Sequence, residues 1–311
     1  MADLHPGLFA ADVHGAVGVL SEPPAELEAL ETLARRARRV LLLGMGSSRF
    51  AALDAATLLR SHGVEATAEM ASTGLPQPST PDTLVLAISA TGGSAETVTA
   101  MRRHLGTSMV VGLTGRVESP IGQEADICLQ IAGDGRSGVA CASYRSTVAL
   151  LQQVCGLLVP VPGPGTRERA AKTAAKVLAH SRDWLPQAVE LLAPGPVHVL
   201  APAERTGSAE QSALMLREVP RIPAYACETG DWSHVDVYLT TRPGYRALLY
   251  EGEVIEWATE RGFPVVVAGG SLPGAALQID LPGAEAPFVR PLVETLVAEL
   301  IAAELWALAP I

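Results

Sequence analysis

Short apolar runs alternate with longer segments of helical periodicity along the first half of the chain. Strands that alternate with helices in this way form a parallel sheet with helices on both faces. The pattern therefore predicts an α/β fold with a doubly wound, flavodoxin-like sheet. We expect strands near residues 40–44, 83–89, 108–113 and 126–131, and helices near 48–62, 94–105 and 142–158.

The alternation restarts in the second half of the chain, beyond a segment rich in proline and glycine. Residues 159–165 read VPVPGPG, and the interior of a helix or strand does not tolerate so many prolines. We interpret this segment as a linker. Beyond it we expect helices over 167–192, 207–218, 253–261 and 291–308, and strands over 197–200, 235–239 and 265–267.

The two halves resemble a degenerate internal repeat. The strand at 197–200 corresponds to the strand at 40–43, and we match Thr240 with Ser89 at the end of a following strand. The serine-rich loops of the first half are replaced in the second, so we assign anion binding to the first half alone. We place a helical lead-in at residues 1–37, the first domain at 38–160, a linker and connecting helix at 161–193, and the second domain at 194–311.

Two serine-rich loops in the first half each follow an apolar run and open a helical segment. Backbone N–H groups at a helix start point toward an anion, hydroxyl groups add donors, and glycine lets the backbone approach closely. Loops at the ends of neighbouring parallel strands meet in the crevice where open α/β sheets bind ligands. Helix capping is the alternative role for these residues. The candidate phosphate-binding residues are Gly46, Ser47, Ser48, Ser89, Ala90, Thr91 and Ser94.

Charge and composition narrow the classes of partner. The formal net charge of −10 argues against nucleic acid and against an anionic membrane surface, because both need a basic face. Lysine occurs only at positions 172 and 176, which limits Schiff-base chemistry. We expect neutral donors to hold most of a small phosphorylated metabolite.

Cysteine and histidine usage indicates a cytoplasmic protein without a bound metal. The four cysteines form no C-x-x-C pair, which is typical of reduced thiols in the cytosol. The histidines show no metal-ligand spacing. Neither a signal peptide nor an apolar run of about 20 residues is evident. We expect no cofactor and no membrane contact.

The two loops, their order and the doubled layout are similar to the sugar isomerase (SIS) family, whose members include the isomerase half of glucosamine-6-phosphate synthase and related phosphosugar isomerases and deaminases. The similarity extends over about residues 38–308. It implies two tandem SIS domains. The segment 138–143 resembles a G-V-A-S-T-K motif of the family, which adds Cys141 to the binding residues.

The resemblance also implies two catalytic residues in the second half. Residues 215–218 match a K-L-K-E pattern and residues 230–234 match a G-E-L-K-H pattern, at the family's spacing. In the family the glutamate transfers a proton and the histidine assists ring opening, often from a neighbouring subunit. It therefore implies Glu218 and His234 in these roles, and a homodimer with the site at the subunit interface.

The chain departs from the synthase at several positions. Met215 and Ser143 stand where the synthase has lysines, and the chain has no counterpart of its lysine-bearing C-terminal tail or of its glutaminase domain. We therefore do not expect glutamine-dependent amination.

The sequence favours an enzyme that moves a carbonyl between C1 and C2 of a phosphorylated sugar through an enediol or enediolamine, with one carboxylate as base. This class covers aldose–ketose isomerases and amino-sugar-phosphate isomerases or deaminases. A non-catalytic phosphosugar sensor is the alternative, favoured by the lost lysines. A dinucleotide-binding oxidoreductase is disfavoured, because Arg49 occupies the third glycine position of G-x-G-x-x-G.

Overall fold

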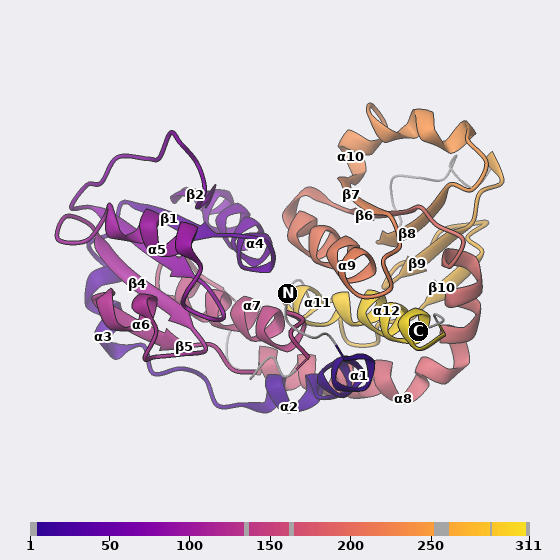
Figure 1. Ribbon diagram of the computed structural model, residues 1–311, viewed down its shortest axis with the longest axis horizontal. Coiled ribbons are helices and arrows are strands. Elements are labelled where there is room, and N and C mark those ends of the chain that lie inside the picture. Colours follow the sequence, from indigo (N-terminus) through magenta and orange to yellow (C-terminus); the bar gives the residue numbers. More distant parts are fainter. Residues whose placement is uncertain (1–4, 134–136, 162–164, 252–260, 287, 309–311) are drawn as a thin grey trace. The chain divides into compact units, whose positions relative to one another are not determined.

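The computed structural model describes residues 5–133, 137–161, 165–251, 261–286 and 288–308. The chain divides into two compact units. The first unit comprises residues 22–134 and 142–164, and the second unit comprises residues 1–21, 135–141 and 165–311. Figure 1 shows a sheet flanked by helices in each unit.

The first unit holds a five-stranded parallel sheet in the order β2-β1-β3-β4-β5. Its strands are β1 (Arg39–Gly44), β2 (Glu65–Met70), β3 (Thr83–Ile88), β4 (Met109–Thr114) and β5 (Ile127–Gln130), and its helices are α3 (Glu28–Ala34), α4 (Ser47–Ser61), α5 (Ala95–Arg102), α6 (Pro120–Glu124) and α7 (Ala142–Cys155).

Apolar side chains explain the order of this sheet. Every residue of β3 and β4 is buried, as central strands of a parallel sheet require. Leu41, Val85 and Val110 lie in one core cluster with Met101 of α5 and Ile121 of α6. Helix α4 packs against β1, β2 and α7.

The second unit holds another five-stranded parallel sheet, in the order β10-β9-β8-β6-β7. Its strands are β6 (Val197–Ala201), β7 (Ala224–Glu228), β8 (Arg246–Tyr250), β9 (Val265–Ala268) and β10 (Leu277–Ile279). Its helices are α1 (Pro6–His14), α2 (Ala16–Ser21), α8 (Thr166–Leu192), η1 (Ala203–Arg205), α9 (Thr206–Glu218), α10 (Thr229–Trp232), η2 (Asp236–Thr241), α11 (Arg290–Val293) and α12 (Thr295–Leu308).

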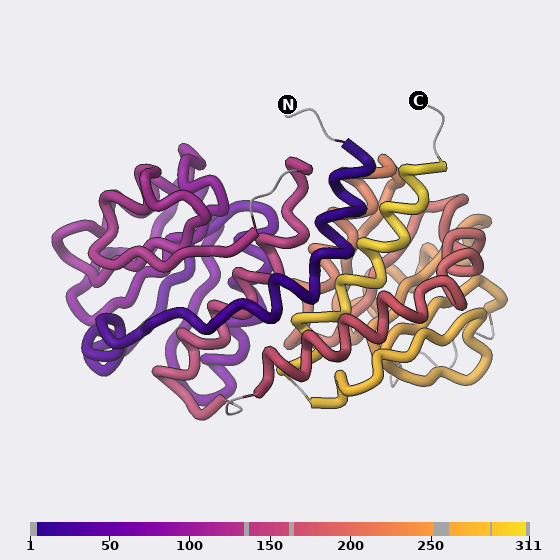
Figure 2. Tube along the Cα trace, turned by 90° about the horizontal axis from the view of Figure 1, so that it is seen from below, coloured from indigo at the N-terminus to yellow at the C-terminus, as the bar shows by residue number. Residues whose placement is uncertain are grey.

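Helices and sheet enclose a separate core in the second unit. Leu200, Trp232, Tyr245 and Leu249 belong to one buried cluster. Helices α1, α8 and α9 pack against α12, and Figure 2 shows α1 running beside it. None of the helices within the described residues is long and apolar enough to cross a membrane.

The two sheets share one topology. Read in the direction β7-β6-β8-β9-β10, the second sheet repeats the order of the first, so β6 corresponds to β1 and β8 corresponds to β3. In both sheets the chain moves from its first strand to an edge strand and then returns to the other side. The predicted α/β fold with parallel sheets and flanking helices is confirmed.

One predicted strand is wrong. Residues 235–239 have the composition of a strand, but the structure forms the 3-10 helix η2 there. Val237 and Thr240 are buried three residues apart, which is the repeat of a 3-10 helix. Thr240 therefore ends no strand, and the residue that follows β8, the counterpart of β3, is Glu251. The predicted helix at 253–261 lies almost entirely outside the described residues.

Candidate functional site

The first serine loop joins β1 to α4 through a tight turn in the first unit. A Cβ atom on Gly44 would lie 2.9 Å from the backbone nitrogen of Arg49, so the turn requires glycine there. Gly46 has φ +50°, which also favours glycine. Helix α4 begins at Ser47 without a side-chain cap. Its first-turn N–H groups therefore have no side-chain acceptor. The Ser48 nitrogen donates to the Met45 carbonyl at 3.2 Å, and the other first-turn N–H groups can bind an anion.

The second serine loop joins β3 to α5. Gly92 has φ +64°, and a Cβ there would lie 1.8 Å from Ser119 Oγ, so only glycine fits. The Ser94 hydroxyl accepts a hydrogen bond from the Thr97 nitrogen and caps α5. The Thr91 hydroxyl accepts from the Gly93 nitrogen, and the Ala90 carbonyl accepts from the Gly115 nitrogen. These four residues hold the loop's shape.

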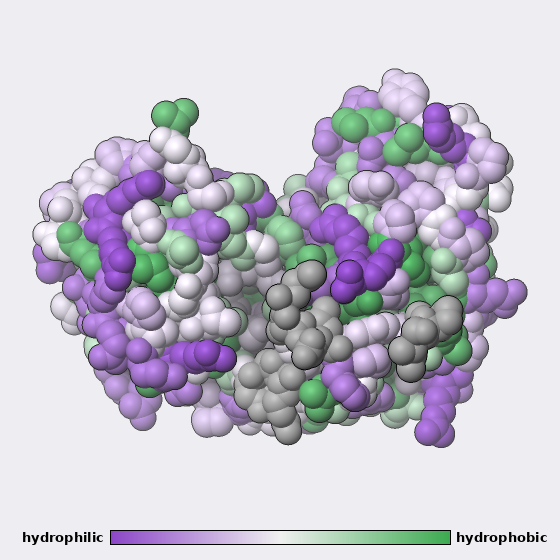
Figure 3. Space-filling view, viewed as in Figure 1, coloured by the Kyte–Doolittle hydropathy of each residue, from purple (hydrophilic) through white to green (hydrophobic). Residues whose placement is uncertain are grey.

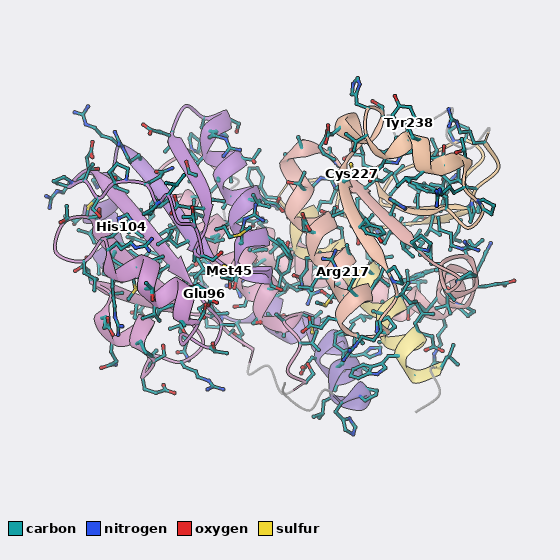
Figure 4. All side chains as sticks on the ribbon, turned by 45° about the horizontal axis from the view of Figure 1, so that its top comes forward. Met45, Glu96, His104, Arg217, Cys227 and Tyr238 are labelled. Carbon is teal, nitrogen blue, oxygen red and sulfur yellow. The ribbon has the colours of Figure 1, made fainter. Side chains whose placement is uncertain are left out.

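Both loops lie at the carboxyl edge of the first sheet. β1 and β3 are parallel neighbours, and β2 lies on the other side of β1, so the loops flank the point where the strand order reverses. Figure 4 labels Met45 of the first loop and Glu96, which follows the second. Within the described residues, no protein acceptor or donor pairs with the hydroxyls of Ser47, Ser48 and Ser89. Their free donors suit an anionic oxygen.

Arg49 is a candidate ligand that the sequence analysis did not select. It follows the two serines in the first turn of α4, and its Nε is buried without a hydrogen-bond partner among the described residues. A guanidinium beside uncapped amides is a strong phosphate donor. Its place directly after the two serines is the signal in the sequence. In the sequence analysis above, Arg49 appears only as the residue at the third glycine position of the dinucleotide motif.

Cys141 belongs to the second unit and is buried. It ends a short segment that begins at Ser137, whose backbone nitrogen donates to Asp12 Oδ2 at 3.1 Å. Gln211 of α9 donates from Nε2 to the Ala140 carbonyl at 2.8 Å. Gln211 is fully buried, and its Oε1 has no partner within the described residues. Gln211 has no local signal in the sequence, because its partner lies 71 residues away.

Glu218 is the last residue of α9 and is half-buried. Burial raises the pKa of its carboxyl above the ordinary value, and the charge of Arg221 opposes this effect. A carboxylate with a raised pKa is a stronger base, which suits proton abstraction near neutral pH. Arg221 also donates from Nε to the Glu218 carbonyl at 3.1 Å.

His234 lies in the second unit between α10 and η2 and is exposed. Three carboxylates lie near His234 in the sequence and could orient its ring, namely Glu228, Asp231 and Asp236. The Glu228 carboxylate instead accepts from the Gly230 and Asp231 nitrogens and caps α10. Asp236 lies 3.5 Å from His198 Nδ1. Two of the three carboxylates are therefore engaged elsewhere.

The second unit places Glu218 and His234 toward opposite edges of its sheet. Helix α9 starts at the carboxyl edge, after β6, and ends before β7 begins, so Glu218 lies toward the amino edge. His234 follows the other end of β7, at the carboxyl edge. The five residues of β7 separate these edges by roughly 16 Å. Within one unit the two residues therefore follow and precede opposite ends of β7.

The residues around Glu218 explain the departures from the family pattern. Met215, at the position of a family lysine, is fully buried in the packing of α9. Arg217 is exposed, and its Nη1 donates to the Ala224 carbonyl at the start of β7. Cys227 lies near the carboxyl end of β7, and Tyr238 lies in η2. In Figure 4 Arg217 lies apart from both of these residues. Neither side chain offers an amine to a sugar carbonyl.

The described part of the chain contains no group of three or more His, Cys, Asp or Glu side chains that could hold a metal ion. Several histidines have structural contacts instead. His5 Nδ1 caps α1 by accepting from the Leu8 nitrogen. His104 Nδ1 lies 3.0 Å from Ser79 Oγ, and the His198 ring stacks on Tyr245 with centroids 4.3 Å apart.

Comparison with known proteins identifies an SIS domain in the chain. The family model described as the SIS domain matches residues 33–155. The isomerizing glutamine–fructose-6-phosphate aminotransferase of Aeropyrum pernix is 28% identical over 287 residues, which cover 84% of this chain and 45% of that protein. The chain thus spans less than half the length of this relative.

Solved structures share the fold over nearly the whole chain. The C-terminal domain of glucosamine-fructose-6-phosphate aminotransferase from Francisella tularensis has a TM-score of 0.75 at 15% identity, with 97% of this chain and 96% of that chain covered. Tagatose-6-phosphate ketose/aldose isomerase from Escherichia coli has a TM-score of 0.73 at 16% identity, with 96% and 91% covered. Residues 33–155 therefore form an SIS domain, and the chain is homologous to the isomerase domain of glucosamine-fructose-6-phosphate aminotransferase.

Proposed function

We propose that this chain binds a phosphorylated sugar and moves its carbonyl between C1 and C2, as an aldose–ketose isomerase or an amino-sugar-phosphate isomerase or deaminase. The observation that supports this most strongly is the pair of loops at the reversal point of the first sheet, where the hydroxyls of Ser47, Ser48 and Ser89 have no protein partner within the described residues. The names of two similar proteins, an isomerizing glutamine–fructose-6-phosphate aminotransferase and a tagatose-6-phosphate ketose/aldose isomerase, support the same reaction class.

The phosphate group is bound by both loops in this proposal. The hydroxyls of Ser47, Ser48 and Ser89 and the uncapped amides of α4 donate to its oxygens, and Arg49 adds charge. Thr91 and Ser94 act through the loop backbone and through the cap of α5. Ala90 contributes its backbone. Cys141, in the segment that Gln211 holds, remains a predicted binding residue.

Glu218 is the base in the proposed reaction. Its carboxylate takes the proton from C2 of the aldose, the electron pair forms the C1–C2 double bond, and O1 receives a proton to give the enediol. The protonated Glu218 then returns a proton to C1, while O2 loses its own to give the ketose. For an amino sugar the return of the proton to C1 gives a C2 imine, and a water molecule hydrolyses the C=N bond to give the ketose and ammonia. Partial burial keeps the pKa of Glu218 raised for both transfers.

A second copy of the chain completes the site in this proposal. The second unit holds Glu218 and His234 at opposite sheet edges, so His234 acts on the sugar bound by another copy, where it assists ring opening. The residues that follow His234 expose apolar surface, since Val235, Tyr238 and Leu239 are 55%, 72% and 39% exposed. Figure 3 shows apolar side chains exposed at this end of the second unit, as a contact between copies requires.

The shared strand order supports an interpretation of the chain as two tandem SIS domains, with the boundaries 38–160 and 194–311. The family model matches the first of these. We further propose that the protein acts in the cytoplasm, where its four cysteines, which form no disulfide, stay reduced.

A non-catalytic phosphosugar sensor is the second candidate function. Burial of Met215 favours it, because the family lysine has no replacement on this face of α9. A sensor needs the phosphate loops but gains nothing from the raised pKa of Glu218. The two functions therefore differ in what loss of the Glu218 carboxylate does.

Proton NMR in D₂O tests the proposal with a panel of hexose and amino-hexose 6-phosphates. Isomerisation or deamination through an enediol exchanges the C1 or C2 proton, so its signal fades whichever product forms. Glu218→Gln should abolish the exchange and retain binding, whereas Glu210→Gln, on the same helix, should leave the exchange intact. Binding without exchange in the unaltered protein would refute the enzyme and favour the sensor.

A further inference from the structure

The carboxyl edge of the second sheet carries charged residues where the first sheet carries its serines. Strand register aligns Leu43 of β1 with Ala87 of β3, and Leu200 of β6 with Leu249 of β8. The residue two places beyond Ala87 is Ser89, and the residue two places beyond Leu249 is Glu251.

The loop that follows the first strand also carries a charged residue in the second sheet. Arg205 ends η1 and precedes α9, in the connection that follows β6, as the first serine loop follows β1. Arg205 and Glu251 therefore lie in the two connections whose counterparts in the first sheet carry the serines. The structure joins these two residues directly, since Arg205 Nη2 donates to Glu251 Oε2.

Two guanidinium groups meet the Glu251 carboxylate. Arg290 Nη1 lies 3.5 Å from the same Oε2 atom that Arg205 binds, and a Cβ on Gly269 would lie 3.4 Å from this nitrogen. On its other side Arg205 Nη1 donates to Glu294 Oε2. The side chains of Arg205 and Glu294 are 5% and 0% exposed, whereas that of Glu251 is 44% exposed.

Among the ion pairs of the described residues, Glu251 supplies the second negative charge of this cluster. Arg205 and Arg290 face one buried carboxylate, Glu294, and the charge of Glu251 compensates the second guanidinium. Glu251 occupies this position with φ +77°, a left-handed conformation that is costly for a residue with a Cβ. Its backbone is thus held in an unfavourable region while its carboxylate binds both arginines.

We propose that Arg205 and Arg290 form a second anion site at the carboxyl edge of the second sheet, which the chain fills with its own Glu251 carboxylate. The site has the chemistry of a phosphate site, namely two guanidinium groups at a strand-order reversal. Because Glu251 occupies it, the protein takes one phosphorylated ligand per chain, at the first sheet. The proposed function enters this inference only as the comparison with the first-sheet loops.

Removal of Glu251 should therefore open a site for inorganic phosphate. We would make Glu251→Gly in a Ser48→Ala, Ser89→Ala background, so that the first-sheet loops no longer bind phosphate. Glycine removes the carboxylate and relaxes the positive φ. The four tryptophans all lie in the range of the second unit, so thermal unfolding followed by tryptophan fluorescence reports on it.

In chloride the Glu251→Gly variant should unfold at a lower temperature than its background, and 20 mM phosphate at equal ionic strength should raise its midpoint by on the order of 3 °C. Glu204→Gly removes an exposed carboxylate from the same edge and controls for general salt effects. Adding Arg290→Gln should cancel the phosphate response of Glu251→Gly.

Several results would overturn the inference. One is a folded Glu251→Gly or Glu251→Asn variant that responds to phosphate no more than Glu204→Gly does. Another is failure of both Glu251 variants to fold even when refolded in phosphate. If the Ser48→Ala, Ser89→Ala background itself still responds strongly to phosphate, the first-sheet site is wrong. The extra response of the Glu251 variants over that background still decides the second-sheet site.

Discussion

Gly92 is the residue at which the second serine loop is most sensitive to substitution, and Gly92→Ala tests the loop's geometry. An added Cβ would lie 1.8 Å from Ser119 Oγ, 2.5 Å from Ser119 Cβ and 2.6 Å from Thr114 Oγ1. No rotamer of the alanine relieves these contacts, because the Cβ position is fixed by the backbone. Either Ser119 and Thr114 move, or the loop from Ser89 to Ser94 moves.

The expected cost has two parts. Alanine at φ +64° loses about 1 kcal/mol relative to glycine. Overpacking against Ser119 and Thr114 adds about 1–3 kcal/mol. Gly92→Ala should thus lower the free energy of unfolding of the first unit by about 2–4 kcal/mol and weaken sugar-phosphate binding by displacing Ser89.

Gly106→Ala provides the matched control for this substitution. Gly106 lies in the same unit with φ +73°, and a Cβ there would have no atom within 4 Å. This variant should lose only about 1 kcal/mol and retain ligand affinity. Urea unfolding followed by far-UV circular dichroism, with calorimetric titration of inorganic phosphate, measures both effects. Equal costs for the two variants, or unchanged phosphate affinity in Gly92→Ala, would refute the steric argument.

Two further predictions concern titration and the segment that Gln211 holds. Burial lowers the pKa of His104 below the ordinary 6.5, so its neutral form is favoured in the folded state. The free energy of unfolding should therefore fall as the pH drops below about 6.5. Urea midpoints measured against pH should show this fall, and His104→Asn should make the dependence on pH less steep. An unchanged dependence in His104→Asn would contradict the prediction. Gln211→Leu removes the donor to the Ala140 carbonyl and should cost about 1–3 kcal/mol of stability. Its sugar-phosphate affinity, measured by titration calorimetry, should fall as well, and unchanged affinity would argue against a positioning role.

The parts of the fold that were predictable from sequence are those with strong local signals. β1, β3 and β4 are buried apolar runs between glycine- and serine-rich loops, so their positions were clear. The edge strand β2 reads EATAEM and is only partly buried, which leaves no apolar run to detect. The residues of η2 combine strand-like composition with a three-residue repeat of burial, and composition misled the prediction.

The candidate site divides in the same way. The serine loops were identifiable because each is a continuous stretch of a few residues. The link from Gln211 to the Ala140 carbonyl and the link from Arg205 to Glu251 join residues 71 and 46 positions apart. Only the register of the strands and the packing of α9 bring such partners together, and neither follows from local pattern.

Subunit mixing tests most directly the claim that Glu218 and His234 of different copies share one site. Glu218→Gln and His234→Ala would carry different tags. Each would be expressed alone, and the two would also be coexpressed so that hybrid dimers form. A hybrid dimer has one site that carries both substitutions and one site that carries neither. Each variant alone should be inactive in the proton-exchange assay, and an equal mixture should recover about one quarter of the unaltered activity per chain. No recovery in purified hybrid dimers, or full activity of His234→Ala alone, would contradict the shared site.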